Sequence, residues 1–255
     1  GDDLYSGSRY VQGVGATKGL GLLVDHSGND RYTAAFKYPN NYGNAASWEG
    51  WSQGVGVGFR SLAAGGIGIL CDRAGDDRYE AGNFSQACGY FFGMGMLEDF
   101  AGDDRYIGNR YTQGAGAHQA AAFFRDFAGN DSYLGREACN QGGAWDITTT
   151  CFVDDGGNDI YRGTSLSQGG ASQNGFAAFI DLSGEDIYES GSRSSGKGGG
   201  NNYHPDYDAK SLGIFLDSGS GKDDYSGVSA DRKNSKIYRD RGEKENTGDG
   251  IFIDR

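Results

Sequence analysis

Eight copies of one short segment, Gly-x-Asp-x-Tyr, divide this chain of 255 residues into units of nearly constant length. A fixed period of this size is typical of repeat proteins, in which each unit packs mainly on its neighbours. Successive copies start 27, 47, 27, 27, 28, 27 and 37 residues apart, so the basic unit has 27 residues and two units carry insertions, at 33–52 and 190–211. The copies begin at Gly1, Gly28, Gly75, Gly102, Gly129, Gly157, Gly184 and Gly221.

Each unit ends in an apolar stretch followed by an aspartate, as in Gly66-Ile-Gly-Ile-Leu-Cys-Asp72. A Leu or Phe lies two residues before that aspartate, and a Gly, Ala or Thr lies two residues further back. This period of two predicts a strand with one face turned inward. A Gln followed by a small residue stands near the middle of most units, at Gln12, Gln53, Gln86, Gln113, Gln141 and Gln168.

The unit therefore contains three short strand-like pieces, around the Tyr, after the Gln and before the final aspartate. No helical period is present, and 27 residues are too few for a propeller blade. We predict an all-β fold, a single parallel β-solenoid domain over 1–255 with about eight coils and right-handed winding. Stacking at roughly 4.8 Å per coil would make a rod about 38 Å long, with Leu/Phe columns inside and ladders of Tyr and Gln along it. Residues 226–255 lack the Gln signature and are expected to form an irregular capping coil.

Composition excludes several classes of protein. The 47 glycines lack the every-third-residue spacing of collagen, and only 2 prolines are present. A net charge of -12 argues against nucleic acid and favours cations as partners. No run of 18 apolar residues exists, so no membrane insertion is expected. The four cysteines form no C-x-x-C pair, and Cys139 with Cys151 either pair or stay free. The start at Gly1, without a signal peptide, fits a processed or excised piece of a larger protein.

Stacking would place two aspartates of every unit in columns of like charge. Carboxylates about 5 Å apart repel by roughly 1 kcal/mol in water and by several times more at an effective dielectric constant near 20. A divalent cation would offset this repulsion, because Ca²⁺ prefers hard oxygen ligands. The candidate ligands are Asp25, Asp30, Asp72, Asp77, Asp99, Asp104, Asp126, Asp131, Asp154, Asp159, Asp181 and Asp186.

The corner between units also resembles a known calcium-binding motif. Gly28-Asn-Asp-Arg-Tyr32 and Gly157-Asn-Asp-Ile-Tyr161 are similar to the hemolysin-type repeats of the RTX β-roll proteins, whose Gly-Gly-x-Gly-[Asn/Asp]-Asp-x-aliphatic units bind Ca²⁺ between stacked turns. Tyr replaces the aliphatic residue here, the nine-residue period is absent, and the leading double glycine occurs only at Gly156-Gly157. The resemblance covers about five residues per unit and implies Ca²⁺ at the turns.

Two other features of the sequence could offset the repulsion between these carboxylates. Arg31, Arg78 and Arg105 occupy the position before the Tyr in three units and could form salt bridges with the aspartates. Alternatively, each Asp accepts backbone N–H bonds within its own turn.

The insertions are the other candidate sites, since irregular copies in a repeat array tend to carry binding. Residues 33–52 contain Tyr38, Tyr42, Trp48 and Trp51, which either stack on sugar rings or fold over the flank with their rings buried. Residues 190–211 contain the group of titratable residues that most resembles a catalytic set: His204, Asp206, Asp208 and Lys210. A solvated glycine-rich loop is the simpler interpretation of this segment. His26 and His118 form no ligand pair and are expected to be exposed.

Repeated chemistry in every unit favours a non-enzymatic, calcium-stabilised scaffold or adhesin-like module of a secreted, cell-surface or periplasmic protein. The first alternative is a carbohydrate-binding module or a polysaccharide-degrading β-helix enzyme, a lyase or a hydrolase. The second is a structural or surface-layer element that associates end to end, because bare sheet edges promote pairing. Two insertions at one corner could wall a cleft and would favour the carbohydrate function.

Overall fold

The structure, a computed structural model, describes residues 1–40, 42, 47–207, 209–219, 221–228, 232–234, 236–240 and 248–255. Within these ranges the chain is all-β, as predicted, with long sheets of parallel strands and no helix. The described residues accordingly contain no helix long and apolar enough to cross a membrane.

Sheet 1 is built from the strands that carry the repeated tyrosines, and all of its pairings are parallel. Each Tyr lies beside the Tyr of the next unit, as Tyr106 does beside Tyr133. The strands, in order, are β1 (Leu4–Gly7), β3 (Arg31–Ala34), β7 (Arg78–Ala81), β11 (Arg105–Gly108), β14 (Ser132–Gly135), β17 (Ile160–Arg162), β20 (Ile187–Glu189) and β22 (Asp224–Gly227).

Sheet 2 is built from the strands that end each unit. Eight of them run parallel, and β23 (Ile237–Asp240) pairs antiparallel with the last. In order they are β2 (Leu20–Val24), β6 (Ile67–Asp72), β10 (Met94–Asp99), β13 (Ala121–Asp126), β16 (Thr149–Asp154), β19 (Phe176–Asp181), β21 (Leu212–Asp217) and β24 (Asp249–Asp254).

Sheet 3 follows the glutamines and consists of two-residue strands. It contains β5 (Gly56–Val57), β9 (Gly89–Tyr90), β12 (Gly116–Ala117), β15 (Ala144–Trp145) and β18 (Ala171–Ser172). A fourth, two-stranded sheet pairs β4 (Glu49–Ser52) of the first insertion with β8 (Asn83–Ser85). The three strand positions expected from the 27-residue unit are therefore confirmed.

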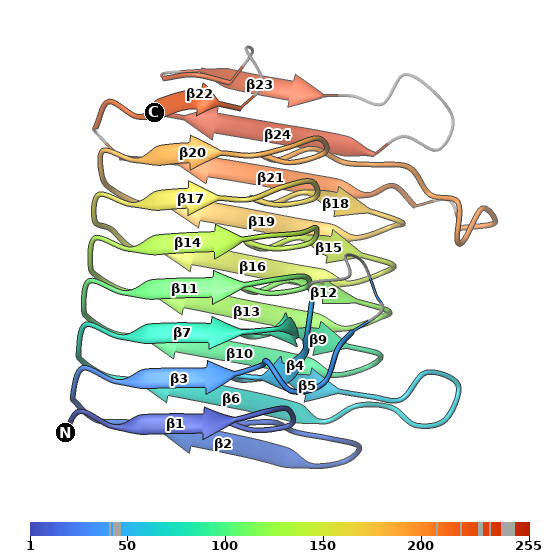
Figure 1. The fold of residues 1–255 in the computed structure, drawn as a ribbon. Helices are drawn as coiled ribbons and strands as arrows, with labels where there is room; N and C mark the ends of the chain where they lie inside the picture. The colour runs from blue at the N-terminus through green and yellow to red at the C-terminus, as the bar shows by residue number, and fades with distance from the viewer. Residues whose placement is uncertain are drawn as a thin grey trace.

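The repeat units lie one upon another along the molecule. Every unit contributes one strand to sheet 1 and one to sheet 2, and the second to sixth units also contribute to sheet 3. Figure 1 shows this stack, with the N-terminus at one end and the C-terminus near the other. Equivalent residues of successive units consequently form columns.

Two columns of rings fill the space between sheets 1 and 2. Tyr32 and Tyr79 stack with ring centroids 4.7 Å apart, and Phe124 and Phe152 stack at 4.8 Å. The two columns meet edge to face, as Tyr133 does with Phe152 at 5.1 Å. Such contacts between buried rings are favourable beyond the burial of their area. The ring spacing matches the strand spacing, which confirms the expected tyrosine ladder.

The glutamines tie neighbouring units together. Nε2 of Gln113 donates to the carbonyl of Tyr106 in its own unit at 3.3 Å and to that of Leu134 in the next unit at 3.1 Å. Small residues opposite them bring sheet 3 close to sheet 2: a Cβ on Gly68 would lie 2.1 Å from the carbonyl oxygen of Val55. Both expectations, the glutamine ladder and the close approach of the sheets, are confirmed.

The outer face of sheet 2 is apolar and partly exposed, which the sequence analysis did not anticipate. Inward-facing residues alternate with outward-facing ones along every strand, as the burial pattern of β6 shows. Outward side chains are exposed at several places along the sheet, among them Leu22 at 60%, Phe123 at 37% and Phe176 at 39%. We call them the outer face; its middle column is Leu22, Ile69, Met96, Phe123, Cys151, Ala178, Ile214 and Ile251.

Candidate metal centres

Two columns of buried aspartates face each other at one edge of the stack, where the chain passes from sheet 2 to sheet 1. The first column ends the strands of sheet 2, and we call its members terminal aspartates: Asp25, Asp72, Asp99, Asp126, Asp154, Asp181, Asp217 and Asp254. The second precedes the strands of sheet 1, and we call its members motif aspartates: Asp3, Asp30, Asp77, Asp104, Asp131, Asp159, Asp186 and Asp223. All of them except Asp3 are buried.

Each motif aspartate after Asp3 binds the backbone of the preceding unit through one carboxylate oxygen. Oδ1 of Asp104 accepts a hydrogen bond from the main-chain N–H of Asp77 at 2.6 Å, and Oδ1 of Asp131 accepts one from Asp104 at 2.6 Å. The bonds cross between units, whereas the sequence analysis considered bonds within one turn. One oxygen of each of these aspartates is therefore committed to the ladder.

The terminal aspartates do accept such bonds within their own turns. Oδ1 of Asp99 accepts from the N–H of Ala101 at 3.3 Å, and its Oδ2 accepts from the hydroxyl of Tyr79 at 2.6 Å. The same pair of bonds holds Asp126, through Ala128 and Tyr106. Backbone turns therefore explain part of how these carboxylates are stabilised.

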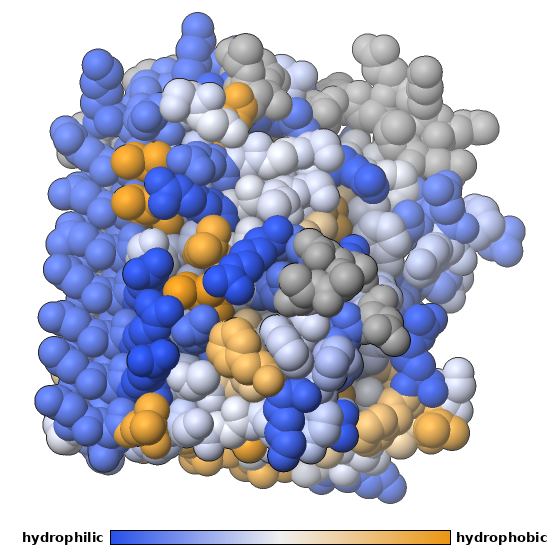
Figure 2. Space-filling view, viewed as in Figure 1, coloured by the Kyte–Doolittle hydropathy of each residue, from blue (hydrophilic) through white to orange (hydrophobic). Residues whose placement is uncertain are grey.

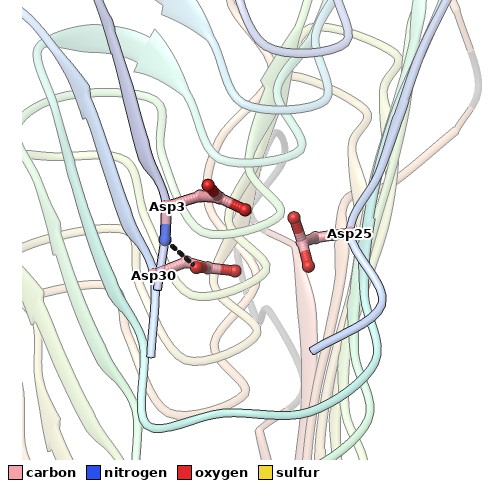
Figure 3. Close-up of side chains that lie close together, drawn as sticks. All are labelled: Asp3, Asp25 and Asp30. Atoms are coloured by element: carbon pink, nitrogen blue, oxygen red, sulfur yellow. Dashed lines mark hydrogen bonds between the residues drawn. The ribbon is translucent and has the colours of Figure 1, made fainter. Parts of the chain in front are cut away.

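The carboxylates converge in groups of three, each made of one terminal aspartate and two successive motif aspartates. In each group, one carboxylate oxygen from each of the three residues lies within 4.8 Å of the other two. Figure 3 shows the first, in which Asp3 and Asp30 lie side by side and turn their carboxylates toward Asp25. Five such triads follow one another: Asp3/Asp25/Asp30, Asp30/Asp72/Asp77, Asp77/Asp99/Asp104, Asp104/Asp126/Asp131 and Asp131/Asp154/Asp159, and two more groups exist among the described residues.

The second oxygen of most motif aspartates has no hydrogen-bond partner. Oδ2 of Asp30, Asp77, Asp104 and Asp186 is buried without one. The described part of the chain also offers no ion pair to any of the twelve predicted ligands. Arg31 and Arg78 instead approach Glu80, at 4.0 and 2.9 Å. Arginine, the second offset considered from the sequence, therefore does not pair with these carboxylates.

Burial changes the acidity of several carboxyl groups in the two columns. Burial first, and then neighbouring charge, raises the pKa of Asp104 to about 10 and that of Asp159 to about 9. Burial likewise raises the pKa of Asp99 to about 7, even though the bond from Tyr79 opposes it. Without a cation, these carboxyl groups hold protons near neutral pH.

The triads suit a divalent cation bound by oxygen. A Ca²⁺ ion contacts its ligands at about 2.4 Å, so one ion can touch carboxylates whose oxygens lie within 4.8 Å of one another. Successive triads share a motif aspartate, as the third and fourth share Asp104, so a unit adds one terminal and one motif carboxylate. One divalent ion per unit would neutralise those two charges.

Sequence reasoning missed Asp3, although its motif, Gly1-Asp-Asp-Leu-Tyr5, was recognised. Asp3 completes the first triad. The residue before each motif aspartate forms a separate, exposed ladder: Oδ1 of Asp76 accepts from the N–H of Asp103 at 3.0 Å. Figure 2 shows hydrophilic residues along the left edge of the stack, where Figure 1 places these turns. Adjacent residues in each turn therefore point in opposite directions: the motif aspartate faces inward and the residue before it faces solvent.

The aromatic residues of the first insertion extend a column of rings on the flank. Trp51 stacks on Phe84 at 4.1 Å, and Phe84 stacks on Tyr111 at 5.1 Å. Tyr42 is half exposed and lies 5.8 Å from Phe84. Tyr38 lies under the guanidinium of Arg9, and Trp48 contacts Phe36; both are half-buried. The described part of the insertion therefore packs its rings on the flank, and the ring of Tyr42 stays half exposed.

A small cavity of about 200 Å³ lies beside this column. It is lined by Tyr42 of the first insertion and Arg193 of the second, together with Arg110, Tyr111 and Trp145. Nε of Arg110 is buried without a hydrogen-bond partner. The two insertions thus meet at one site, the condition under which a cleft was expected.

The second insertion brings His204 to a partner that the sequence did not identify. Nε2 of His204 lies 2.6 Å from Oδ1 of Asp146, whose Oδ2 lies 2.5 Å from Nδ1 of His118. His118 is buried, so its expected exposure was wrong; His26 is exposed, as expected. A signal was present, because His118 and Asp146 each follow the unit's Gln by five residues and therefore stack.

No hydrogen bond or ion pair joins the described members of the predicted catalytic set. Asp206 is exposed, and Lys210 pairs with Asp249 at 3.7 Å. Asp208 lies outside the described residues. All four cysteines are free, so Cys139 and Cys151 do not pair.

Comparisons with family models, with curated proteins and with solved structures find no significant match for this chain. Its candidate sites are therefore judged by their own geometry.

Proposed function

We propose that the chain is a parallel β-solenoid stabilised by calcium ions between its coils, and that it serves as a rigid scaffold or adhesin-like module. The observation that carries this proposal is the row of buried Oδ2 atoms without a partner, on Asp30, Asp77 and Asp104, which face the terminal aspartates. A buried carboxylate without a cation or hydrogen bonds is costly.

The repetition supports a scaffold. The same triad recurs along the stack, whereas an enzyme needs one concentrated set of unusual residues. Metal bound to every coil stiffens the whole rod. Millimolar Ca²⁺ is found outside cells, so a secreted or cell-surface protein would have its sites filled, and weak extracellular calcium sites match that supply.

Thermal unfolding in EDTA, in millimolar Ca²⁺ and in Mg²⁺ tests the proposal. Ligand at 100 times its dissociation constant adds about 2.7 kcal/mol per site to the free energy of unfolding. Two filled sites would raise the Tm of a chain of this size by roughly 10 to 20 °C. Equal melting temperatures in Ca²⁺ and EDTA would refute calcium binding.

A matched pair of variants locates the ions. Asp104→Asn removes the charge of a residue shared by two triads, while its amide oxygen can still accept the bond from Asp77. Asp103→Asn makes the same change one residue away, on the exposed ladder. Calorimetric titration should show fewer Ca²⁺ ions bound by Asp104→Asn and an unchanged number for Asp103→Asn.

A second candidate function, binding of an acidic saccharide, is favoured by the flank cavity. Aromatic rings stack on the faces of sugars, and guanidinium groups bind carboxylates with paired hydrogen bonds. Arg110 and Arg193 supply the guanidinium groups and Tyr42 supplies the half-exposed ring in one place. Nε of Arg110 is buried without a hydrogen-bond partner, while its Nη1 lies 3.6 Å from Glu137. A uronate unit matches this chemistry better than a neutral sugar.

Titration with oligogalacturonate and with a neutral oligosaccharide tests this second function. We expect binding of the acidic chain only, weakened at least tenfold (about 1.4 kcal/mol) by Arg193→Gln. Arg162→Gln is the control, because Arg162 is exposed and pairs with Glu189 outside the cavity. Equal affinity for both sugars, or no effect of Arg193→Gln, would refute it.

A further inference from the structure

We infer that the outer face of sheet 2 is an interface between two copies of this chain, packed sheet against sheet. The face is apolar to an extent unusual for a surface: Leu20 is 68% exposed, Leu22 60% and Ile67 42%. Large contiguous apolar patches on folded proteins mark interaction surfaces. Sheets with one apolar face commonly pack face to face about 10 Å apart.

Charge identifies the occupant as a second copy. The chain carries a net charge of -12, yet the outward residues of the eight parallel strands include only Glu98, Arg125 and Asp249 as charged groups, and β23 adds Arg239 at the edge of the sheet. Glu98 and Arg125 lie side by side on neighbouring strands. A two-fold axis parallel to the strands, between β10 and β13, would set Glu98 of each copy opposite Arg125 of the other. The face is therefore electrostatically complementary to itself.

Size and shape also fit two copies. With that axis, six of the eight parallel strands overlap, a flat area of roughly 29 by 20 Å, or about 600 Å² per copy. Both copies together reach about 1,200 Å², the lower limit of standard stable interfaces. Met96 would then lie against Phe123 of the second copy. A depression of about 330 Å³ beside Met96, Phe123 and Cys151 leaves room for side chains to interdigitate.

A lipid surface fits the face less well. Membrane-binding surfaces combine apolar side chains with a rim of Lys and Arg that attracts anionic headgroups. The described strands of sheet 2 carry two basic outward residues, Arg125 and, on β23 at the edge, Arg239; Arg125 already pairs with Asp155 at 2.7 Å. An acidic protein would be repelled from such a surface.

Sedimentation velocity of the full chain at micromolar concentration, in EDTA and in Ca²⁺, tests the inference. We expect a dimer in both solutions, because the triads lie at the edge of the stack and not on this face. Phe123→Lys should give a monomer that keeps the far-ultraviolet circular dichroism of the wild type, with a melting temperature that no longer depends on protein concentration. Leu62→Lys, which alters an 86% exposed residue away from sheet 2, should leave the dimer intact.

A charge exchange provides the second readout. Glu98→Arg should raise the dissociation constant of the dimer, and adding Arg125→Glu should restore it at least in part. A monomeric wild type, a dimer that survives Phe123→Lys, or association that EDTA abolishes would overturn the inference. So would binding to anionic vesicles that Phe123→Lys removes, since that result would assign the face to lipid.

Discussion

The main-chain N–H of Asp77 donates a hydrogen bond of 2.6 Å to Oδ1 of Asp104, the equivalent residue of the next unit. Because the bond uses one oxygen only, the other is left inside the stack, where it meets the terminal aspartate. The ladder thus stabilises the stacking of the units and at the same time creates the sites that need a cation. Because these carboxylates are buried, the stability of the folded protein should depend on pH.

In EDTA, the stability of the protein should fall as the pH rises from about 5 to about 10. The folded chain keeps protons on groups such as Asp99 and Asp104, whose pKa values are about 7 and about 10, whereas the unfolded chain releases them near pH 4. The contribution of these groups to stability is therefore complete below pH 4 and is lost as the pH passes their folded pKa values. Urea unfolding at a series of pH values measures this.

Calcium should flatten that dependence, because a bound cation keeps the carboxylates ionised in the folded state. The same titration in saturating Ca²⁺ is the control. Stability that stays constant or increases between pH 6 and pH 9 in EDTA would contradict the assigned burial of these carboxylates.

Gly102→Ala should prevent folding or cost several kcal/mol. Gly102 has a φ of 151°, and a Cβ there would lie 1.6 Å from the carbonyl oxygen of Gly75 in the preceding unit. The added methyl group would force two units apart at the turn. Gly19→Ala is the control, since its nearest contact would be 3.1 Å. Soluble yield and far-ultraviolet circular dichroism report the outcome, and two variants of equal stability would contradict the close stacking.

Tyr106→Phe should lower the free energy of unfolding by about 1 to 3 kcal/mol, because it leaves Oδ2 of Asp126 without its buried donor. The hydroxyl of Tyr106 lies 2.8 Å from that oxygen, and the ring itself would stay stacked. Tyr203→Phe, at a 54% exposed position, should change stability little. Chemical denaturation compares the two, and similar values would show that the hydroxyl bond contributes nothing.

Asp146→Asn should loosen the second insertion without melting the stack. Burial alone would raise the pKa of Asp146, but the hydrogen bonds from His118 and His204 outweigh it and hold the pKa below the ordinary value. The contribution of this carboxylate is therefore present at neutral pH and lost as the pH falls through its folded pKa.

Hydrogen exchange measures the effect of Asp146→Asn. Amides of residues 201–207 should exchange faster in this variant, while those of β13 and β16 keep their protection. Asp206→Asn, at an exposed position, is the control. Unchanged exchange at 201–207 would show that the bond between His204 and Asp146 does not hold the insertion.

Most of the regular architecture could be predicted from the sequence, because the period of 27 residues and the alternation before each terminal aspartate carry their own geometry. Tyr32 and Tyr79 had to stack once their units stacked. The alternation before each terminal aspartate marks the inward residues but does not show that the outward ones, such as Met96 and Phe123, are also apolar and form a face. The burial of His118 could not be predicted for a related reason. Its partner Asp146 and the His204 that also binds Asp146 are distant from it in sequence.

The sequence by itself determined the length of the unit, the places of its strands and the residue types that form columns, since equivalent residues of stacked units must become neighbours. The tertiary structure alone decided which oxygen of Asp104 is bonded and which is left facing Asp99. It also decided that Tyr42 and Arg193 line one cavity and that His204 reaches Asp146. Those relationships depend on how sheets are spaced and where insertions fold back, and no local pattern in the chain encodes such distances.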